Sequence, residues 1–366
     1  MHLQKFIAVT LIISNAYFAG TVSAAQPKPL VIKEQGSFAA GGTVITAPGK
    51  FDPEEAFSNL VTGSNGNNGQ TLHGDHLTAS YQIPVNAKKL PIVFLHGAGQ
   101  SARTWDTTPD GREGFKTIFI RRGYSVYVVD QPRRGQSGRS TVDGTINAIP
   151  DEQFWFGQFR VGQWPDYYPG VQFPKGKEAL NQYFRQITPN TAAYDANINS
   201  DSLSALFDRI GPGILVTHSQ GGGNGWLAGM KNPNIKAIVA YEPGSQFVFP
   251  ADELPEPLPS KVDTLAGYPV AKAEFMKLTK IPIIIYYGDN IATEPGGYYG
   301  QDAWRIRLLM ARKWVEVINK YGGNARVIHL PEIGIKGNTH FPFSDLNNLE
   351  IADLLEKWLQ ENKLDQ

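Results

Sequence analysis

The sequence predicts an α/β fold in which helices flank both faces of a mostly parallel central sheet. Short, continuous apolar runs at residues 90–95, 235–241 and 281–287 are typical of strands that are buried on both faces. Amphipathic helical patterns cover residues 304–321 and 347–362. Such an alternation of strands and helices indicates parallel strands joined by crossover helices.

Length and composition restrict the class of protein. The chain has 366 residues, of which 41% are apolar and 19% charged, as in an ordinary globular protein with a sizeable core. Lysine plus arginine equals aspartate plus glutamate, 34 against 34, so no nucleic-acid or membrane-surface partner is expected. There is no cysteine, which excludes disulfides and thiolate chemistry. Neither a metal nor another cofactor is expected, since His73 and His76 lack further ligands at tetrahedral spacing.

The first residues have the pattern of an export signal. Lys5 precedes an apolar run over residues 6–18, which is too short to span a bilayer, and small residues follow at 22–25. We therefore expect a signal peptide over residues 1–24 and a mature domain over 25–366, periplasmic or secreted, and an uncleaved anchor is the alternative. No membrane span is expected after signal removal.

The remaining elements follow in order along the chain. Residues 26–70, rich in Gly, Asn, Ser and Pro, predict an irregular lead-in with an edge hairpin near 42–47. The alternating segment 77–83 predicts the next strand. A helix is expected near 117–122, between strands at 90–95 and 125–130. Further strands are expected at 214–217, 235–241, 281–287 and 326–330.

Two segments interrupt this alternation. Residues 141–201 are long and rich in aromatic side chains, and loops of that length are usually lids or binding elements. A second insertion is expected over residues 244–280, where prolines are frequent. We expect the first to be a cap over an apolar or aromatic pocket, although most of its rings would form its own core.

A candidate nucleophile lies in Thr217-His218-Ser219-Gln220-Gly221, directly after an apolar strand. A serine at a sharp turn from strand to helix is presented above the sheet, and small flanking residues allow the strained turn. The usual pattern has glycine where this chain has Thr217, which a strand end tolerates if the facing helix leaves room. The alternative is a serine in an ordinary glycine-rich turn.

A serine nucleophile needs a base and an acid, which on this type of sheet follow it in the order acid, histidine. Glu242 and Asp289 each come directly after an apolar strand, so either could be the acid, or could cap a turn. His340, between the last strand and the last helix, is the candidate base. A surface or capping histidine is the alternative.

The same chemistry needs two backbone N–H groups to bind the developing oxyanion. His96-Gly97-Ala98-Gly99 follows the strand at 90–95. We assign the amide of Ala98 as one donor and that of Gln220, next to the nucleophile, as the other. The arginines of Pro132-Arg133-Arg134 are expected to be buried partners in the structure rather than substrate contacts.

From about residue 77 to its end, the chain resembles the α/β-hydrolase superfamily, and within it the bacterial esterase 713 group. The resemblance rests on His96-Gly97-Ala98-Gly99, on the turn through Arg134-Gly135-Gln136-Ser137-Gly138, on His218-Ser219-Gln220 and on His340. It implies a glutamate after the sixth strand as the triad acid, a position that Glu242 matches, and this favours Glu242 over Asp289. It also implies a cap at residues 141–201.

The sequence therefore predicts an exported serine hydrolase that cleaves small-molecule carboxylic esters, with an apolar or aromatic portion, through Ser219, His340 and Glu242. An amidase or a perhydrolase on the same triad is one alternative. A non-catalytic ligand-binding protein on a hydrolase scaffold is another. A homodimer is one oligomeric state that the sequence leaves open.

Overall fold

The computed structural model describes residues 28–64 and 66–366. Residues Val31–Gln366 form one compact unit. The expected signal peptide, residues 1–24, lies outside the described residues. No helix in the described ranges has the length and apolar character needed to cross a bilayer.

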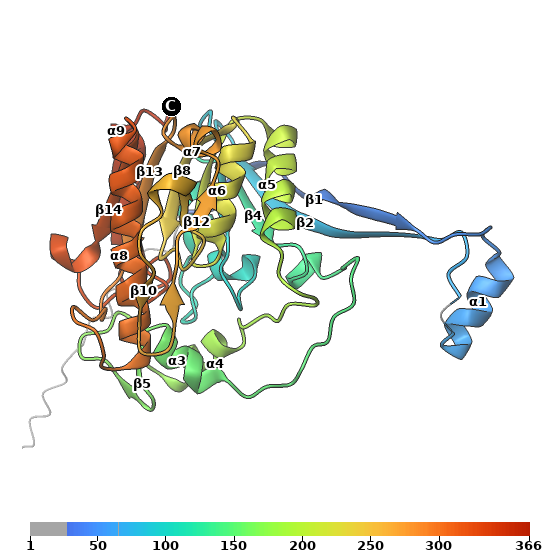
Figure 1. Ribbon diagram of the computed structural model, residues 1–366, viewed down its shortest axis with the longest axis horizontal. Helices are drawn as coiled ribbons and strands as arrows, with labels where there is room; N and C mark the ends of the chain where they lie inside the picture. Colours follow the sequence, from blue (N-terminus) through green and yellow to red (C-terminus); the bar gives the residue numbers. More distant parts are fainter. Residues whose placement is uncertain (1–27, 65) are drawn as a thin grey trace, which may run out of the picture. The chain divides into compact units, whose positions relative to one another are not determined.

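An eight-stranded sheet organises this unit, with the strand order β1-β2-β4-β3-β7-β8-β13-β14 (Figure 1). The strands from β4 to β14 in that order run parallel, whereas β1 and β2 are antiparallel to their neighbours. Its strands are β1 (Ile32–Thr46), β2 (Thr71–Pro84), β3 (Ile92–Leu95), β4 (Val126–Asp130), β7 (Gly213–His218), β8 (Ile235–Tyr241), β13 (Pro282–Tyr287) and β14 (Asn324–His329).

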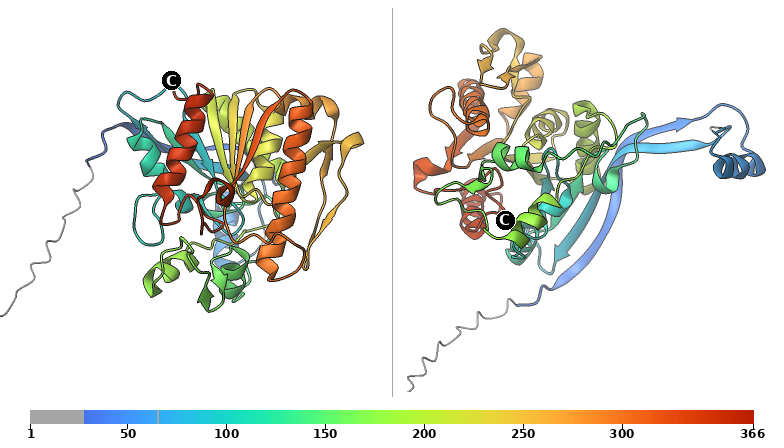
Figure 2. Two further views of the ribbon diagram at one scale, coloured as in Figure 1. Left: turned by 90° about the vertical axis from the view of Figure 1, so that its left-hand side faces the viewer. Right: turned by 90° about the horizontal axis from the view of Figure 1, so that it is seen from below.

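Helices cover both faces of the sheet, as the sequence predicts. The helices α2 (Phe115–Arg121) and α9 (Asn348–Glu361) contact each other on one face. On the other face lie α5 (Ala196–Ile210), α6 (Gly221–Lys231) and α8 (Tyr299–Lys320), and Figure 2 shows α8 and α9 on opposite sides of the strands.

Strand side chains alternate between two apolar layers, because successive residues of a strand point to opposite faces. On the α6 and α8 side, Trp226 and Trp314 are fully buried, with ring centroids 4.4 Å apart. On the α2 side, Phe94, Phe115 and Tyr241 are buried together. Each such side chain contributes about 1.5–3 kcal/mol of burial free energy.

The N-terminal region differs from the expected irregular lead-in. β1 is a 15-residue strand that pairs with β2 from Ile32–Pro84 to Thr46–Thr71. The helix α1 (Pro53–Thr62) belongs to the connection between the two strands and lies at the far end of the hairpin (Figure 1). The β2–β4 ladder ends at Thr78, so the hairpin continues beyond it. Pairing with β2 supplies the backbone hydrogen bonds for a glycine-rich segment whose own composition does not favour a strand.

The segment over residues 141–201 lies at the carboxyl ends of the parallel strands, at the bottom of Figure 1. Residues 142–150 are irregular and exposed, and α5 already begins at Ala196. Its elements are α3 (Glu152–Gln158), β5 (Gly162–Gln163), β6 (Asp166–Tyr167) and α4 (Lys177–Phe184).

Residues 244–280 form short strands beside α8, followed by a helix against α6. β9 pairs in parallel with β12, and β10 pairs with β11 as a hairpin. The bounds are β9 (Val248–Pro250), β10 (Leu258–Pro259), β11 (Thr264–Leu265), β12 (Tyr268–Val270) and α7 (Lys272–Leu278).

Candidate active site

Ser219 lies in the turn between β7 and α6, at the carboxyl end of the sheet. Its φ of 53° is in the left-handed region, the strained conformation that a sharp strand-to-helix turn imposes. The turn is held because Ser219 N donates to Tyr241 O at 2.9 Å. A Cβ on Gly221 would lie 2.7 Å from the carbonyl oxygen of His96, so only glycine allows this close approach.

Thr217 is accommodated where the usual motif has glycine. Its Cγ2 lies 2.9 Å from the position that a Cβ on Gly225 of α6 would occupy. A glycine on the helix therefore provides the room that the strand residue lacks. The motif departs from its usual sequence without losing the close packing between β7 and α6.

His340 lies in the loop between β14 and α9, and its ring is fully buried. Its Nδ1 is 3.1 Å from Oε2 of Glu242, so Nδ1–H donates to the carboxylate and Nε2 keeps its lone pair. Nε2 has no hydrogen-bond partner among the described residues, and neither has Oγ of Ser219. Burial lowers the pKa of His340 well below its ordinary value, and the positive charges of Arg160 and Arg307 lower it further.

Ring contacts with residues distant in the chain fix the orientation of the His340 imidazole. Phe159 stacks on it with centroids 4.8 Å apart and planes inclined by 11°, and Trp304 lies 4.2 Å away. His218 lies 4.5 Å away, and its Nε2 is 3.0 Å from the carbonyl oxygen of His340. His218 therefore has a packing and hydrogen-bonding role beside the imidazole of His340.

Glu242 follows β8 directly, has a φ of 53° and is fully buried. Its Oε1 accepts from the backbone N–H of Gly288 and from Nη2 of Arg160, the latter at 2.6 Å. This leaves Oε2 for His340. The structure thus brings together the histidine and the first of the two candidate acids.

Asp289, the second candidate acid, is placed differently. Its Oδ2 accepts from the backbone N–H of Gly337 at 2.7 Å, and its own N–H donates to the carbonyl of Asn338. Both partners belong to the loop that carries His340. Asp289 therefore braces the backbone of that loop, and its carboxylate makes no hydrogen bond to the imidazole.

The two expected oxyanion donors are the amides of Ala98, in the loop after β3, and of Gln220, which follows Ser219 in the chain. A Cβ on Gly97 would lie 2.6 Å from Cβ of Ser219, so the loop after β3 passes directly beside the nucleophile. Within residues 28–64 and 66–366, the backbone N–H groups of Ala98 and Gln220 donate no hydrogen bond. Two such free amides are what a developing negative oxygen requires.

The orientation of the Ala98 amide is set by the carbonyl before it. Oxygen of Gly97 accepts from Nδ1 of His96 at 2.9 Å and from Nη1 of Arg134 at 2.7 Å. Nε2 of His96 accepts from the backbone N–H of Gln131, which assigns the proton to Nδ1. Since C=O and N–H of a trans peptide point in opposite directions, this arrangement turns the Ala98 N–H away from Arg134.

Both arginines after β4 have the buried structural role that the sequence suggests. Nε of Arg133 is 2.7 Å from Oδ1 of Asp75 in a buried ion pair. Nε of Arg134 donates to Oδ1 of Asn190 at 2.6 Å. Burial lowers the pKa of Arg134 to about 10, which still leaves the guanidinium charged at neutral pH.

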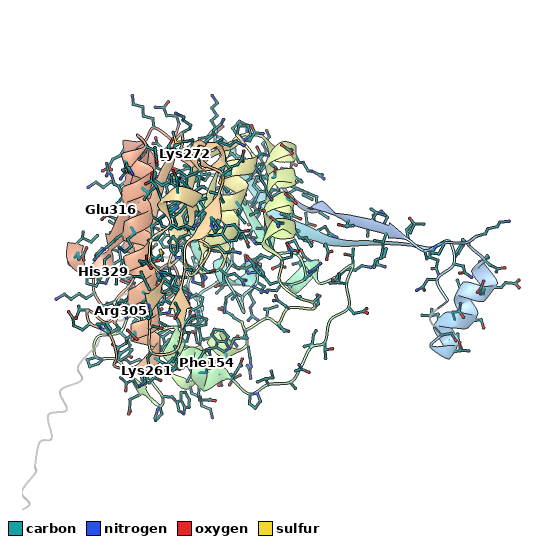
Figure 3. The ribbon with its side chains drawn as sticks, viewed as in Figure 1. Phe154, Lys261, Lys272, Arg305, Glu316 and His329 are labelled. Carbon is teal, nitrogen blue, oxygen red and sulfur yellow. The ribbon has the colours of Figure 1, made fainter. Side chains whose placement is uncertain are left out.

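A cavity of about 750 Å³ lies between α3, the start of α8 and the segment at residues 261–263. Phe154 and Lys261, at the lower end of α8 in Figure 3, line it together with Tyr298, Tyr299 and Arg307. Nε of Arg307 also lies 3.9 Å from the Cβ position of Gly244, which is itself 3.7 Å from Oγ of Ser219. Arg307 therefore links the cavity to the surroundings of Ser219, although none of the three candidate triad residues lines the cavity.

Arg160 and Phe159 are the residues that sequence reasoning missed. Both lie in the aromatic segment, and both contact the candidate triad. A signal was present, since a charged residue between apolar neighbours in Phe159-Arg160-Val161 has to find a buried partner. The sequence did not reveal which carboxylate that partner is.

Known proteins resemble this chain in sequence and in fold. A model of the alpha/beta hydrolase family matches residues 92–331. A probable secreted lipase phiG from a fungal species (Fungal sp., strain ATCC 74256) is 30% identical over 311 residues, 76% of this chain and 84% of the lipase. The structure of a novel bacterial esterase is 29% identical, with a TM-score of 0.69, over 92% of this chain and 98% of the esterase.

Proposed function

The chain belongs to the alpha/beta hydrolase family and is a carboxylesterase-type hydrolase, and we propose that it cleaves esters by acyl transfer through Ser219, His340 and Glu242. The observation that carries the proposal is the buried contact of His340 Nδ1 with Glu242 Oε2, which leaves Nε2 without a partner among the described residues, in a ring that lies 4.5 Å from that of His218, the residue before Ser219. Catalytic hydrogen bonds in ligand-free sites often close only when substrate binds.

The reaction proceeds in two halves. Oγ of Ser219 attacks the ester carbonyl carbon while Nε2 of His340 takes its proton, and the carboxylate of Glu242 stabilises the imidazolium. The imidazolium then protonates the leaving alcohol as the C–O bond breaks, which leaves an acyl-enzyme. Water, deprotonated by the same nitrogen, attacks this ester and releases the acid, and the proton returns to Ser219.

The negative oxygen of each tetrahedral intermediate is bound by the amides of Ala98 and Gln220. Each donor contributes about 3 kcal/mol of transition-state stabilisation. The lack of another hydrogen-bond partner for either amide within the described ranges supports this role. The hydrogen bonds to the carbonyl of Gly97 fix the direction of the Ala98 N–H before substrate binds.

The substrate is an ester with an apolar or aromatic portion. The phenyl and phenol rings of Phe154, Tyr298 and Tyr299 around the nearby cavity support this class. Residues 141–201, which place Phe154 there, would act as the cap, and residues 244–280 would act as a second insertion beside it. Amide bonds and perhydrolysis use the same triad, so graded amide and ester substrates distinguish these activities.

Export is the second part of the proposal. The pattern of residues 1–24 supports a signal peptide, and the relative named a probable secreted lipase supports a periplasmic or secreted location. Fractionation of the native host, with mass spectrometry of the mature N-terminus, tests it. A chain that keeps residues 1–24 in the cytoplasm would contradict it.

The catalytic proposal is tested with a fluorophosphonate probe and the Ser219→Ala variant. We expect an adduct at Ser219 in the wild type and an essentially complete loss of ester hydrolysis in the variant, with unchanged circular dichroism. Retained hydrolysis would refute the assignment. A folded wild type without any adduct and without hydrolysis would favour the non-catalytic binding protein.

A further inference from the structure

Arg160 is a fully buried charged residue whose guanidinium contacts both strand-end carboxyl residues. Nη2 donates to Oε1 of Glu242 at 2.6 Å, and Nε donates to the carbonyl oxygen of Asp289 at 2.8 Å. The turn after α3 presents the side chain, with a φ of 57° at Arg160 and its N–H bonded to the carbonyl of Gly157 at 3.1 Å. The guanidinium carbon lies 5.3 Å from the centroid of the Trp304 ring.

The residue before it holds the histidine. The carbonyl oxygen of Phe159 accepts from the backbone N–H of His340 at 3.0 Å, and the Phe159 ring stacks on the imidazole. Two consecutive residues of the aromatic segment therefore contact the base and the acid. Besides covering a pocket, this segment therefore supplies contacts that hold His340 and Glu242 in place.

We infer that Arg160 is a positioning residue of the hydrolytic site, which fixes the carboxylate of Glu242 toward His340 and places a buried positive charge behind that carboxylate. The inference rests on the proposed function of Ser219, His340 and Glu242. Arg160 touches neither substrate nor the reacting atoms in this scheme. It acts through the two residues that do the proton transfer.

The hydrogen-bond geometry of Glu242 supports the positioning role. A carboxylate that is free to rotate can present either oxygen to a histidine. Here Oε1 is occupied by Arg160 and by the N–H of Gly288, so that Oε2 alone faces Nδ1 of His340. A buried carboxylate also needs such a partner, since desolvation penalises an unpaired charge.

The charges around His340 support the second half of the inference. Glu242 faces it from β8, Arg160 from the aromatic segment, Arg307 from α8 and His218 from β7. Burial comes first in lowering the pKa of the imidazole, and the positive charges of Arg160 and Arg307 repel its protonated form. Burial also lowers the pKa of His218, which is therefore neutral. Of these two arginines only Arg160 is fully buried, so solvent and salt screen its charge less than that of Arg307.

The pH profile of kcat/KM separates this role from mere support of the fold. Neutral His340 is the active form, so activity falls on the acid side as the imidazole takes up a proton. Without the charge of Arg160 the imidazolium is less repelled, so the acid limb moves to higher pH. For Arg160→Met we expect a shift of about one pH unit. We also expect kcat/KM at its optimum to fall by about 100-fold from misplacement of Glu242.

Two further variants isolate the charge. Arg160→Lys keeps it, and its acid limb should stay close to that of the wild type while kcat/KM falls. Arg160→Gln keeps hydrogen-bonding capacity without charge, and its limb should move with that of Arg160→Met. Arg305→Met is the matched control, because Arg305 on α8 (Figure 3) pairs with Asp302 at 2.7 Å in a buried ion pair and has no contact with the triad. Its acid limb should not move.

The outcomes are decisive. If the acid limb of kcat/KM in Arg160→Gln or Arg160→Met lies at the same pH as in the wild type, the inference is overturned, even if the stability of the variant falls. Equal shifts in Arg160→Lys and Arg160→Gln overturn the charge effect. Where Arg160→Met does not fold, the Lys and Gln variants decide. Failure of the proposed function is distinguishable, since it would appear in the wild type as absent fluorophosphonate labelling of Ser219.

Discussion

Replacing the two strand-end carboxylates by amides separates the catalytic acid from its neighbour. In Glu242→Gln, an amide replaces a carboxylate that accepts from Arg160, Gly288 and His340. A glutamine has a single acceptor oxygen, so at least one of these donors then faces an NH₂ group. If that donor is Nδ1–H of His340, the imidazole turns to the wrong tautomer. We expect kcat to fall by about 10⁴-fold.

The same substitution reduces stability, because it leaves the buried guanidinium of Arg160 without its ion pair. Breaking a buried pair by removing one partner costs about 3–5 kcal/mol of unfolding free energy. Asp289→Asn keeps one acceptor oxygen for the N–H of Gly337 or of Asn290. We expect it to cost about 1 kcal/mol and to change kcat by less than about tenfold.

The assay is hydrolysis of a chromogenic p-nitrophenyl ester at saturating concentration, together with urea unfolding of each variant. Both variants are compared at one pH and with one substrate, so that the ratio of their kcat values identifies the acid. A larger loss of kcat in Asp289→Asn would refute the assignment of Glu242. Wild-type kcat in a folded Glu242→Gln would refute the role of the carboxylate altogether.

Two further predictions concern the surroundings of the site. Burial raises the pKa of Asp345 to about 7, although Thr339 donates two hydrogen bonds to it. Because the folded chain then keeps a proton that the unfolded chain loses, the unfolding free energy should fall as pH rises from about 4 to about 7. Asp345→Asn should lack this part of the fall, and identical pH dependence of urea unfolding in both proteins would contradict it. A Cβ on Gly244 would lie 3.5 Å from the Trp304 ring and 3.7 Å from Oγ of Ser219, in ordinary contact. Gly244→Ala should therefore fold normally but lower kcat/KM for bulky esters more than for acetates, and an equal loss for both would place the substrate elsewhere.

The order of strands and helices was predictable because it depends on local patterns. β8 was expected at residues 235–241 and has those bounds, since a continuous apolar run of that length fits a doubly buried strand. For β1 only an edge hairpin near residues 42–47 was predicted and not the full strand, because its glycine-rich sequence has little strand propensity and its hydrogen bonds come from β2. Nothing local to residues 32–46 indicates that partner.

The choice between Glu242 and Asp289 shows the same limit within the site. Both are carboxylates at strand ends, so the residues alone left both open, and only the resemblance to a family favoured Glu242. Arg160 lies 82 residues from Glu242 in the chain, and Glu242 lies 98 residues from His340. No periodicity or motif can report pairings over such distances.

The sequence by itself determined the class of fold, the strained turn at Ser219 and the set of groups able to transfer a proton. These depend on backbone conformation and on residue chemistry, which neighbours in the chain express directly. Tertiary structure alone decided which carboxylate faces His340 and that Arg160 occupies its other oxygen. The reason is that a buried charge is tolerated only opposite a partner, and packing of distant segments selects that partner.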